Sequence, residues 1–201
     1  MKATVFLVDD DAAVLRGLEK IVEGEGFDVK TFESAELLLQ SCGPQSAGCV
    51  VLDMRMPAMD GLQAQAELKR RGILMPVIFL TGHGDVPMSV RAMKAGAYDF
   101  LEKPVAADTL LARVRGALKL DEYRWLRQSE RDAAQVRLSL LTSREEGVLA
   151  LLLSGRTNKE VARQLGLSPR TVEIHRKNIL AKTGTSNLIE LGQLYYIADS
   201  V

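Results

Sequence analysis

One buried strand and the loop that follows it are encoded by Cys49-Val50-Val51-Leu52-Asp53-Met54-Arg55-Met56-Pro57. The first four residues are apolar and include two β-branched side chains, which is typical of a short strand buried in a sheet. The strand ends at the carboxylate of Asp53, and Pro57 and Asp60-Gly61 then indicate a loop. Because open α/β sheets hold their active sites at the carboxyl ends of their strands, Asp53 is the first candidate functional residue.

A second acidic strand end lies near the start of the chain. The apolar run Thr4-Val5-Phe6-Leu7-Val8 is followed directly by Asp9, Asp10 and Asp11. Neighbouring parallel strands would bring these acids and Asp53 to the same edge of a sheet. Carboxylates gathered away from water need a cation to stay ionised together, and oxygen ligands with access to water favour Mg²⁺. The two strand ends therefore predict a magnesium site.

Strands and helices alternate from residue 4 to about residue 120. Apolar runs predict strands at residues 4–8, 27–32, 49–53, 76–80 and 97–102. Helical periodicity predicts helices at residues 12–25, 35–41, 61–71 and 86–94, and a further helix that begins near Ala107. This alternation predicts an α/β domain with a parallel sheet and helices on both of its faces.

Two further reactive side chains follow predicted strands. Thr81 ends the fourth strand, and the fifth strand leads into Lys103. Together with Asp53 and a metal ion, they supply the nucleophile, the hydroxyl donor and the positive charge that phosphoryl transfer needs. Each also has an ordinary explanation, because aspartate and threonine often cap turns and a lysine is usually a solvated surface charge. Their joint order along the strands favours the functional interpretation.

The chain from residue 3 to about residue 120 resembles the receiver domain of two-component response regulators. The resemblance is carried by Val8-Asp9-Asp10, Leu52-Asp53-Met54-Arg55-Met56-Pro57 with Asp60-Gly61, Leu80-Thr81-Gly82 and Lys103-Pro104. It implies a flavodoxin-like (βα)5 fold in which Asp53 is the phosphoacceptor. It also implies that Mg²⁺ is held by Asp9, Asp10, Asp53 and the backbone carbonyl of Arg55.

The same resemblance assigns roles to residues of the later strands. Thr81 and Lys103 would contact the phosphoryl oxygens, and Phe100 matches the aromatic side chain that moves when the family switches. Without the resemblance, Phe100 would be an ordinary core residue. The peptide bond between Lys103 and Pro104 is usually cis in the family. His83 is expected to be a polar loop residue, because a single histidine is weak evidence for a metal site.

Residues 121–138 differ in composition from the regions on either side. Mixed charges and good helix formers, without proline or glycine, predict a continuous helix that extends the last helix of the first domain. The apolar positions do not form a regular heptad, which favours a solvated spacer helix over a coiled coil. The predicted boundaries are residues 1–120 for the receiver domain, 121–138 for the linker and 139–201 for a second domain.

The second domain carries the start signals of four helices. Capping boxes begin at Thr142 and Thr157, Ser168-Pro169 is an N-cap followed by a proline, and a residue of Ser186-Asn187 caps the last helix. The second and third helices are joined by Gly166-Leu167-Ser168, which is typical of a helix-turn-helix. These signals predict an all-α domain of four helices.

A local excess of basic residues accompanies the helix-turn-helix. Between residues 155 and 182, seven basic residues and two acidic residues give a charge of plus five, within a chain whose formal net charge is zero. Such a patch suits DNA phosphates, although a solvated helical face also carries charges. On the third helix, Arg170, Glu173, Ile174 and Lys177 share the polar side. An isoleucine in this place can contact a thymine methyl group.

Residues 140 to about 195 resemble the LuxR-type DNA-binding domain. The resemblance is carried by Leu141-Thr142-Ser143-Arg144-Glu145, Asn158-Lys159-Glu160-Val161-Ala162, Leu165-Gly166 and Thr171-Val172-Glu173-Ile174-His175-Arg176. It implies base recognition by Glu173, Ile174 and Lys177. It implies contacts with the DNA backbone by Asn158, Lys159, Arg170, Thr171 and Arg176. The whole chain resembles response regulators of the NarL/FixJ class, and residues 81–88 resemble its FixJ-like branch.

This class implies a transcriptional regulator rather than an enzyme. A sensor histidine kinase would phosphorylate Asp53, and a homodimer formed on phosphorylation would bind double-stranded promoter DNA. A phosphatase of the haloacid-dehalogenase type would place an acid two residues after its nucleophile, where this chain has Arg55. A DNA-binding protein independent of phosphorylation would not need the full acidic set. An RNA-binding protein is less favoured, because no aromatic stacking motif is found.

The composition agrees with a water-soluble regulator. The chain has 201 residues, of which 47% are hydrophobic and 26% charged, as in ordinary globular proteins. Cys42 and Cys49 lack a Cys-x-x-Cys spacing and indicate reduced thiols. No apolar run is long enough to span a membrane and no signal-peptide pattern is found, so we expect a cytoplasmic protein with no membrane partner.

Overall fold

The computed structural model describes residues 4–82 and 86–200. The chain divides into two compact units, Met1–Arg124 and Trp125–Val201. Helix α5, Ala107–Leu138, runs without interruption from the first unit into the second. The prediction of a continuous helix through residues 121–138 is therefore confirmed.

Five parallel strands form the sheet of the first unit. In chain order the elements are β1 Thr4–Val8, α1 Ala12–Gly24, β2 Asp28–Phe32, α2 Ala35–Ser41, β3 Gly48–Asp53, α3 Gly61–Arg70, β4 Val77–Thr81, α4 Val86–Lys94, β5 Asp99–Glu102 and α5. The strand order is β2-β1-β3-β4-β5, and every pairing is parallel. The predicted parallel α/β fold is confirmed, and the ends of its elements differ from the prediction by a residue or two.

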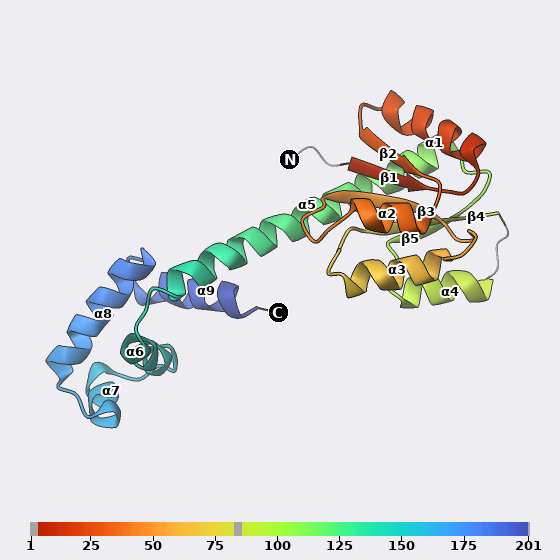
Figure 1. Ribbon diagram of the computed structural model, residues 1–201. Helices are drawn as coiled ribbons and strands as arrows, with labels where there is room; N and C mark the ends of the chain where they lie inside the picture. Colours follow the sequence, from red (N-terminus) through yellow and green to blue (C-terminus); the bar gives the residue numbers. More distant parts are fainter. Residues whose placement is uncertain (1–3, 83–85, 201) are drawn as a thin grey trace. The chain divides into compact units, whose positions relative to one another are not determined.

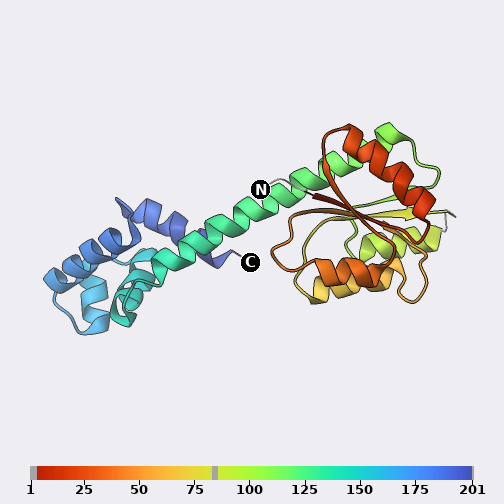
Figure 2. The same cartoon turned by 45° about the horizontal axis from the view of Figure 1, so that its top comes forward.

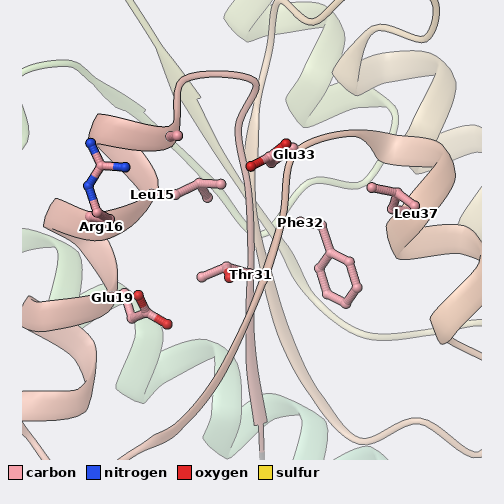
Figure 3. A pocket seen from close by; sticks show the side chains of 8 residues that line it. Leu15, Arg16, Glu19, Thr31, Phe32, Glu33 and Leu37 are labelled. Atoms are coloured by element: carbon pink, nitrogen blue, oxygen red, sulfur yellow. The ribbon is translucent and has the colours of Figure 1, made fainter.

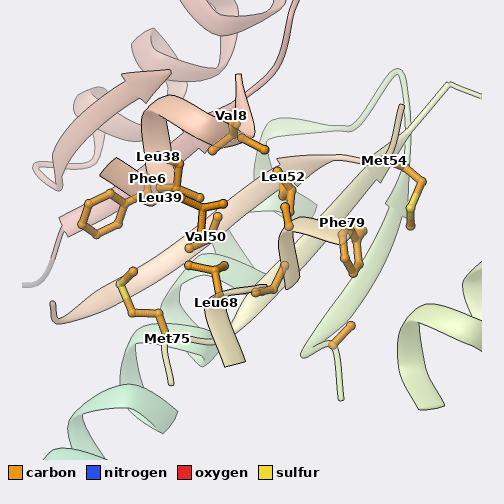
Figure 4. Packing of buried hydrophobic residues seen from close by; sticks show 14 of the residues in the cluster. Phe6, Val8, Leu38, Leu39, Val50, Leu52, Met54, Leu68, Met75 and Phe79 are labelled. Atoms are coloured by element: carbon orange, nitrogen blue, oxygen red, sulfur yellow. The ribbon is translucent and has the colours of Figure 1, made fainter. Parts of the chain in front are cut away.

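Helices cover both faces of this sheet, with α1 and α5 on one face and α2, α3 and α4 on the other (Figures 1 and 2). On the first face, strand side chains pack against Leu18 of α1 and Leu110 of α5. On the second face, Phe6, Leu52 and Phe79 pack against α2 and α3 (Figure 4). Successive residues of a strand point to opposite faces of the sheet, and helices cover both faces here, so β3 is buried along its whole length. Burial on both faces explains its continuous apolar sequence.

Two hydrogen bonds join helix α5 to the start of β3 and to the segment just before β4. The buried carboxylate of Asp121 accepts a hydrogen bond from the Gly48 N–H at 2.7 Å, and Arg124 donates to the Leu74 carbonyl at 2.9 Å. Burial raises the pKa of Asp121. Gly48 has a φ of 140°, and a Cβ there would lie 1.8 Å from the carbonyl oxygen of Thr4. Only glycine fits where β3 begins.

The last turns of α5 belong to the second unit. Arg131 and Gln135 donate to the Ala198 carbonyl, and Arg137 donates to the Thr183 carbonyl at 2.6 Å. Ala134 is buried in the core of this unit. These contacts show that one continuous helix contributes to two separate cores.

Four further helices complete the second unit, and their bounds are α6 Ser143–Leu153, α7 Asn158–Leu165, α8 Pro169–Thr183 and α9 Leu188–Asp199. Each begins at a predicted cap, with Asn187 rather than Ser186 capping α9. Gly166 and Gly184 end α7 and α8 in the left-handed conformation, at φ values of 64° and 62°. Val148, Val172 and other apolar side chains of these helices form one core. The predicted all-α domain is confirmed.

We expect Asp121→Ala to lower the free energy of unfolding of the first unit by about 1–3 kcal/mol, because the buried Gly48 N–H loses its acceptor. Urea unfolding followed by circular dichroism measures this change. Asp121→Asn keeps an oxygen acceptor and should lose much less stability. Glu122→Ala, a change at the exposed neighbouring position, is the control. Equal stability of the two alanine variants would contradict the assigned role of Asp121.

Candidate functional site

Two buried carboxylates meet one lysine at the carboxyl edge of the sheet. Asp9 follows β1, Asp53 ends β3, and Lys103 follows β5. The Lys103 Nζ donates to Asp9 Oδ2 at 2.5 Å and also to Asp53 Oδ1. Asp9 is 1% exposed and Asp53 is 5% exposed. The predicted convergence of these three strand ends is therefore present.

The second oxygen of each carboxylate is held by the backbone. Asp9 Oδ1 accepts a hydrogen bond from the Asp11 N–H at 3.0 Å, and Asp53 Oδ2 accepts one from the Arg55 N–H at 2.7 Å. Burial raises the pKa of Asp9 although Lys103 and the Asp11 N–H oppose that shift. Burial alone would lower the pKa of Lys103, but its hydrogen bonds to Asp53 and Asp9 raise it. The lysine is therefore a firmly charged partner for both acids.

Gly61 lets helix α3 begin directly beside the phosphoacceptor candidate. Its N–H donates to the Met54 carbonyl at 3.1 Å. A Cβ at this position would lie 2.7 Å from the carbonyl oxygen of Asp53 and 2.9 Å from Cε1 of Phe79. The sequence pattern indicates a loop that leads into a helix here, but it gives no sign that Gly61 is required by this close approach.

Thr81 and Phe100 lie on β4 and β5, the two strands that follow β3 in the sheet order. Thr81 is buried at the carboxyl end of β4, and its carbonyl accepts the Lys103 N–H at 2.7 Å. Phe100 pairs in register with Phe79 and is half-buried against the core of Figure 4. The Lys103-Pro104 peptide bond is cis, as expected. His83, which was expected to be a polar loop residue, and the Gly84-Asp85 part of the FixJ-like motif lie outside the described residues.

Two of the four predicted magnesium ligands, Asp9 and Asp53, lie close together. Asp9 and Asp53 supply oxygen atoms that converge on one positive charge, which suits a hard cation. Asp10 is exposed, and within residues 4–82 and 86–200 no three His, Cys, Asp or Glu side chains gather closely enough to hold a metal ion. The donor set fits Mg²⁺ in its chemistry, and the participation of Asp10 and of the Arg55 carbonyl stays a prediction.

A hollow in the first unit lies apart from these carboxylates (Figure 3). Its lining comes from α1, β2 and α2 and includes Leu15, Arg16, Phe32 and Leu37. None of Asp9, Asp53 and Lys103 lines it.

The candidate nucleic-acid interface is the exposed side of α8. Arg170, Glu173, Ile174 and Lys177 are all exposed, and Ile174 has an exposed fraction of 52%. The opposite side of the helix is buried through Val172 and Ile179. This division agrees with the predicted recognition face.

The predicted contacts with the DNA backbone are less uniformly exposed. Lys159 is exposed, whereas Asn158 and Arg176 are half-buried. Thr171 is half-buried at the first turn of α8, where its Oγ1 lies 2.8 Å from Ser168 Oγ and its N–H donates to that oxygen. Thr171 therefore has a structural contact in addition to its predicted role.

One of the basic residues in the predicted patch serves the fold. Lys182 forms an ion pair with the buried Glu145 at 2.7 Å, which ties α8 to the start of α6. Glu145 also accepts hydrogen bonds from the N–H and hydroxyl of Thr142. Burial alone would raise the pKa of Glu145, but Lys182 and Thr142 lower it to about 2. Sequence reasoning recognised the capping box but missed the distant lysine.

We expect Lys103→Met to destabilise the first unit by about 3–5 kcal/mol at neutral pH, because two buried carboxylates lose their shared positive partner. Urea unfolding measures the loss, and added Mg²⁺ should restore more stability to this variant than to the wild type. Lys69→Met, at an exposed position of α3, is the control. If both variants unfolded like the wild type, Lys103 would not be the electrostatic partner of the acids.

We expect Glu145→Gln to reduce the acid sensitivity of the second unit. The folded-state pKa of about 2 lies below the ordinary value of 4.5. The stabilisation is therefore complete above pH 4.5 and is lost as the pH falls toward 2. Urea unfolding at a series of pH values should show a smaller loss of stability in this range for the variant than for Glu146→Gln, the exposed control. Equal losses would contradict the assignment.

Comparisons with known proteins identify both domains. Residues 5–115 match the family described as response regulator receiver domain, and residues 139–195 match bacterial regulatory proteins of the luxR family. Nodulation protein W of Bradyrhizobium diazoefficiens is 43% identical over 94% of this chain and 84% of that protein. The transcriptional regulatory protein FixJ of Azorhizobium caulinodans is 41% identical over 96% of this chain and 92% of that protein.

A solved structure extends this likeness to the fold. The structure of the response regulator StyR is 42% identical, covers 97% of this chain and 98% of its own, and has a TM-score of 0.87. Within the described residues, no helix is long and apolar enough to cross a membrane. The chain belongs to the two-component response regulators of the NarL/FixJ type. These proteins are transcriptional regulators rather than enzymes, and they join a receiver domain to a LuxR-type DNA-binding domain.

Proposed function

We propose that Asp53 receives a phosphoryl group from a sensor histidine kinase and that this modification controls DNA binding by the second unit. The convergence of Asp9 and Asp53 on the Lys103 ammonium supports the proposal most directly. It places a carboxylate nucleophile beside a cation that can offset charge on a phosphoryl group. Because a regulator of promoters acts where the DNA is, we place the protein in the cytoplasm.

The transfer needs no proton removal from Asp53, since an ionised carboxylate is already a nucleophile. A bond forms between an Asp53 oxygen and phosphorus as the bond from phosphorus to the kinase imidazole breaks, and the imidazole nitrogen keeps the electron pair. Lys103 then exchanges its Asp53 contact for a phosphoryl oxygen. Receiver domains typically bind Mg²⁺, which supplies further positive charge for these oxygens. Asp9, Asp10, Asp53 and the Arg55 carbonyl would hold it.

The new dianion then changes packing next to β4 and β5. Thr81 would donate its hydroxyl hydrogen to a phosphoryl oxygen, and Phe100 would move inward behind it. The half-buried position of Phe100 beside Phe79 supports such a movement, because a partly exposed ring can be buried further. A local charge thus changes the surface around α4 and β5 and favours a homodimer.

The dimer would place two copies of α8 in the major groove at two half-sites. Glu173, Ile174 and Lys177 would contact base edges, since all three are exposed along α8. The backbone would be contacted by Asn158, Lys159, Arg170, Thr171 and Arg176. These phosphate contacts set the position of the helix but do not select the sequence.

We expect Asp53→Asn to abolish phosphorylation by acetyl phosphate in the presence of Mg²⁺, because an amide is not a competent nucleophile. The acid-labile mass increase of the intact chain measures the modification. Asp108→Asn, at an exposed position of α5, should be labelled like the wild type. The phosphorylated wild type should bind promoter fragments more tightly than Asp53→Asn. Undiminished labelling of Asp53→Asn would refute the proposed phosphoacceptor.

A further inference from the structure

The exposed side of α8 continues for one turn beyond Lys177, the last residue of the predicted recognition face. Helix geometry rotates successive residues by about 100°, so Arg170, Ile174, Lys177, Asn178 and Ala181 lie along one side. All five are exposed. On this rotation, Asn178 lies closer to Ile174 around the helix than Glu173 does. Asn178 therefore lies beside Ile174, at one edge of the face that the proposed function directs at DNA.

No structural role accounts for an asparagine at this position. The Asn178 side chain makes no hydrogen bond to any residue in the part of the chain that the structure describes. Asn187 provides the contrast, because its amide donates to Ser186 and Glu190 and its oxygen caps α9. Asparagine is also an unfavourable residue inside a helix, since it competes for backbone hydrogen bonds. The fold gains nothing from Asn178.

We propose that Asn178 is a specificity-determining residue that recognises adenine in the major groove. A carboxamide can donate to adenine N7 and accept from adenine N6, a bidentate pairing that the other bases do not offer. Its donor and acceptor are both unused within the described residues. Ala181 follows on the same side with a short side chain, which lets this part of the helix approach the bases closely.

The neighbours of Asn178 favour a base over a phosphate as its partner. Lys177 supplies a positive charge one residue away, and an amide beside it is the weaker ligand for a phosphate. Ile174, one turn earlier on the same side, is apolar and exposed and so is suited to a thymine methyl group. Asn178 and Ile174 thus place a polar and an apolar side chain next to one another on one helix face, where both can contact base edges.

The test selects binding sites from randomised duplex DNA with the full-length protein phosphorylated by acetyl phosphate. The wild type should enrich an adenine at one position of each half-site, and Asn178→Ala should lose that preference alone. Affinity for the wild-type site should fall on the order of tenfold, as expected for one bidentate base contact. Thermal stability should stay equal or rise, since alanine is the better helix former. Gln40→Ala, which removes an exposed amide from α2, should change neither result.

A second variant tests the chemistry of the contact. Asn178→Asp retains only acceptors and should shift the preference at that position from adenine to cytosine, whose N4 donates. An adenine preference that survives in both variants would overturn the assignment of Asn178 while leaving the DNA-reading role of α8 intact. If the wild type itself enriched no sequence, base reading by α8 would be overturned. The role of Asn178 rests on base reading by α8 and would be overturned as well.

Discussion

The receiver depends on one electrostatic arrangement, in which the Lys103 ammonium lies between the carboxylates of Asp9 and Asp53. Two carboxylates this deeply buried repel each other, and a shared cation offsets both the repulsion and the cost of removing them from water. The strand order makes the arrangement possible. β1 and β3 are direct neighbours, which brings the acids together, and the lysine arrives from the loop after β5 at the same edge.

The arrangement also explains how a small chemical change can have a large effect. Phosphorylation of Asp53 would give Lys103 a stronger acceptor than the one it now has. The lysine follows β5 directly, and its backbone N–H is bonded to the Thr81 carbonyl. Phe100 lies on β5, only a few residues before the lysine. The backbone around Lys103 is therefore connected to Thr81, which is proposed to contact the phosphoryl group, and to Phe100, which is proposed to move.

The sequence predicted the features that depend on neighbouring residues. The strand ends with their acids, the capping boxes at Thr142 and Thr157 and the Ser168-Pro169 cap of α8 are all found, because each is a local pattern with a local physical cause. Among features that join distant segments, the convergence of the strand ends was predicted from the parallel topology, and others were missed. Gly48 and Asp121 are 73 positions apart, and nothing near either residue indicates their hydrogen bond. The close approach of Gly61 to Asp53 was also missed, because it depends on how the loop after β3 folds back onto the end of that strand.

The charge of the DNA-binding unit shows why burial must be known before charges are counted. Seven basic and two acidic residues lie between positions 155 and 182. Lys182, however, is paired with Glu145, and including that acid gives seven minus three, a net charge of plus four. Affinity for DNA rises with the number of phosphates that are neutralised, and one copy offers only the six remaining basic residues of this segment for such contacts. Two linked copies on adjacent half-sites add their contacts, and the second binds at a high effective concentration. A modest charge on each copy therefore makes DNA binding sensitive to dimerisation, which is the step that phosphorylation is proposed to control.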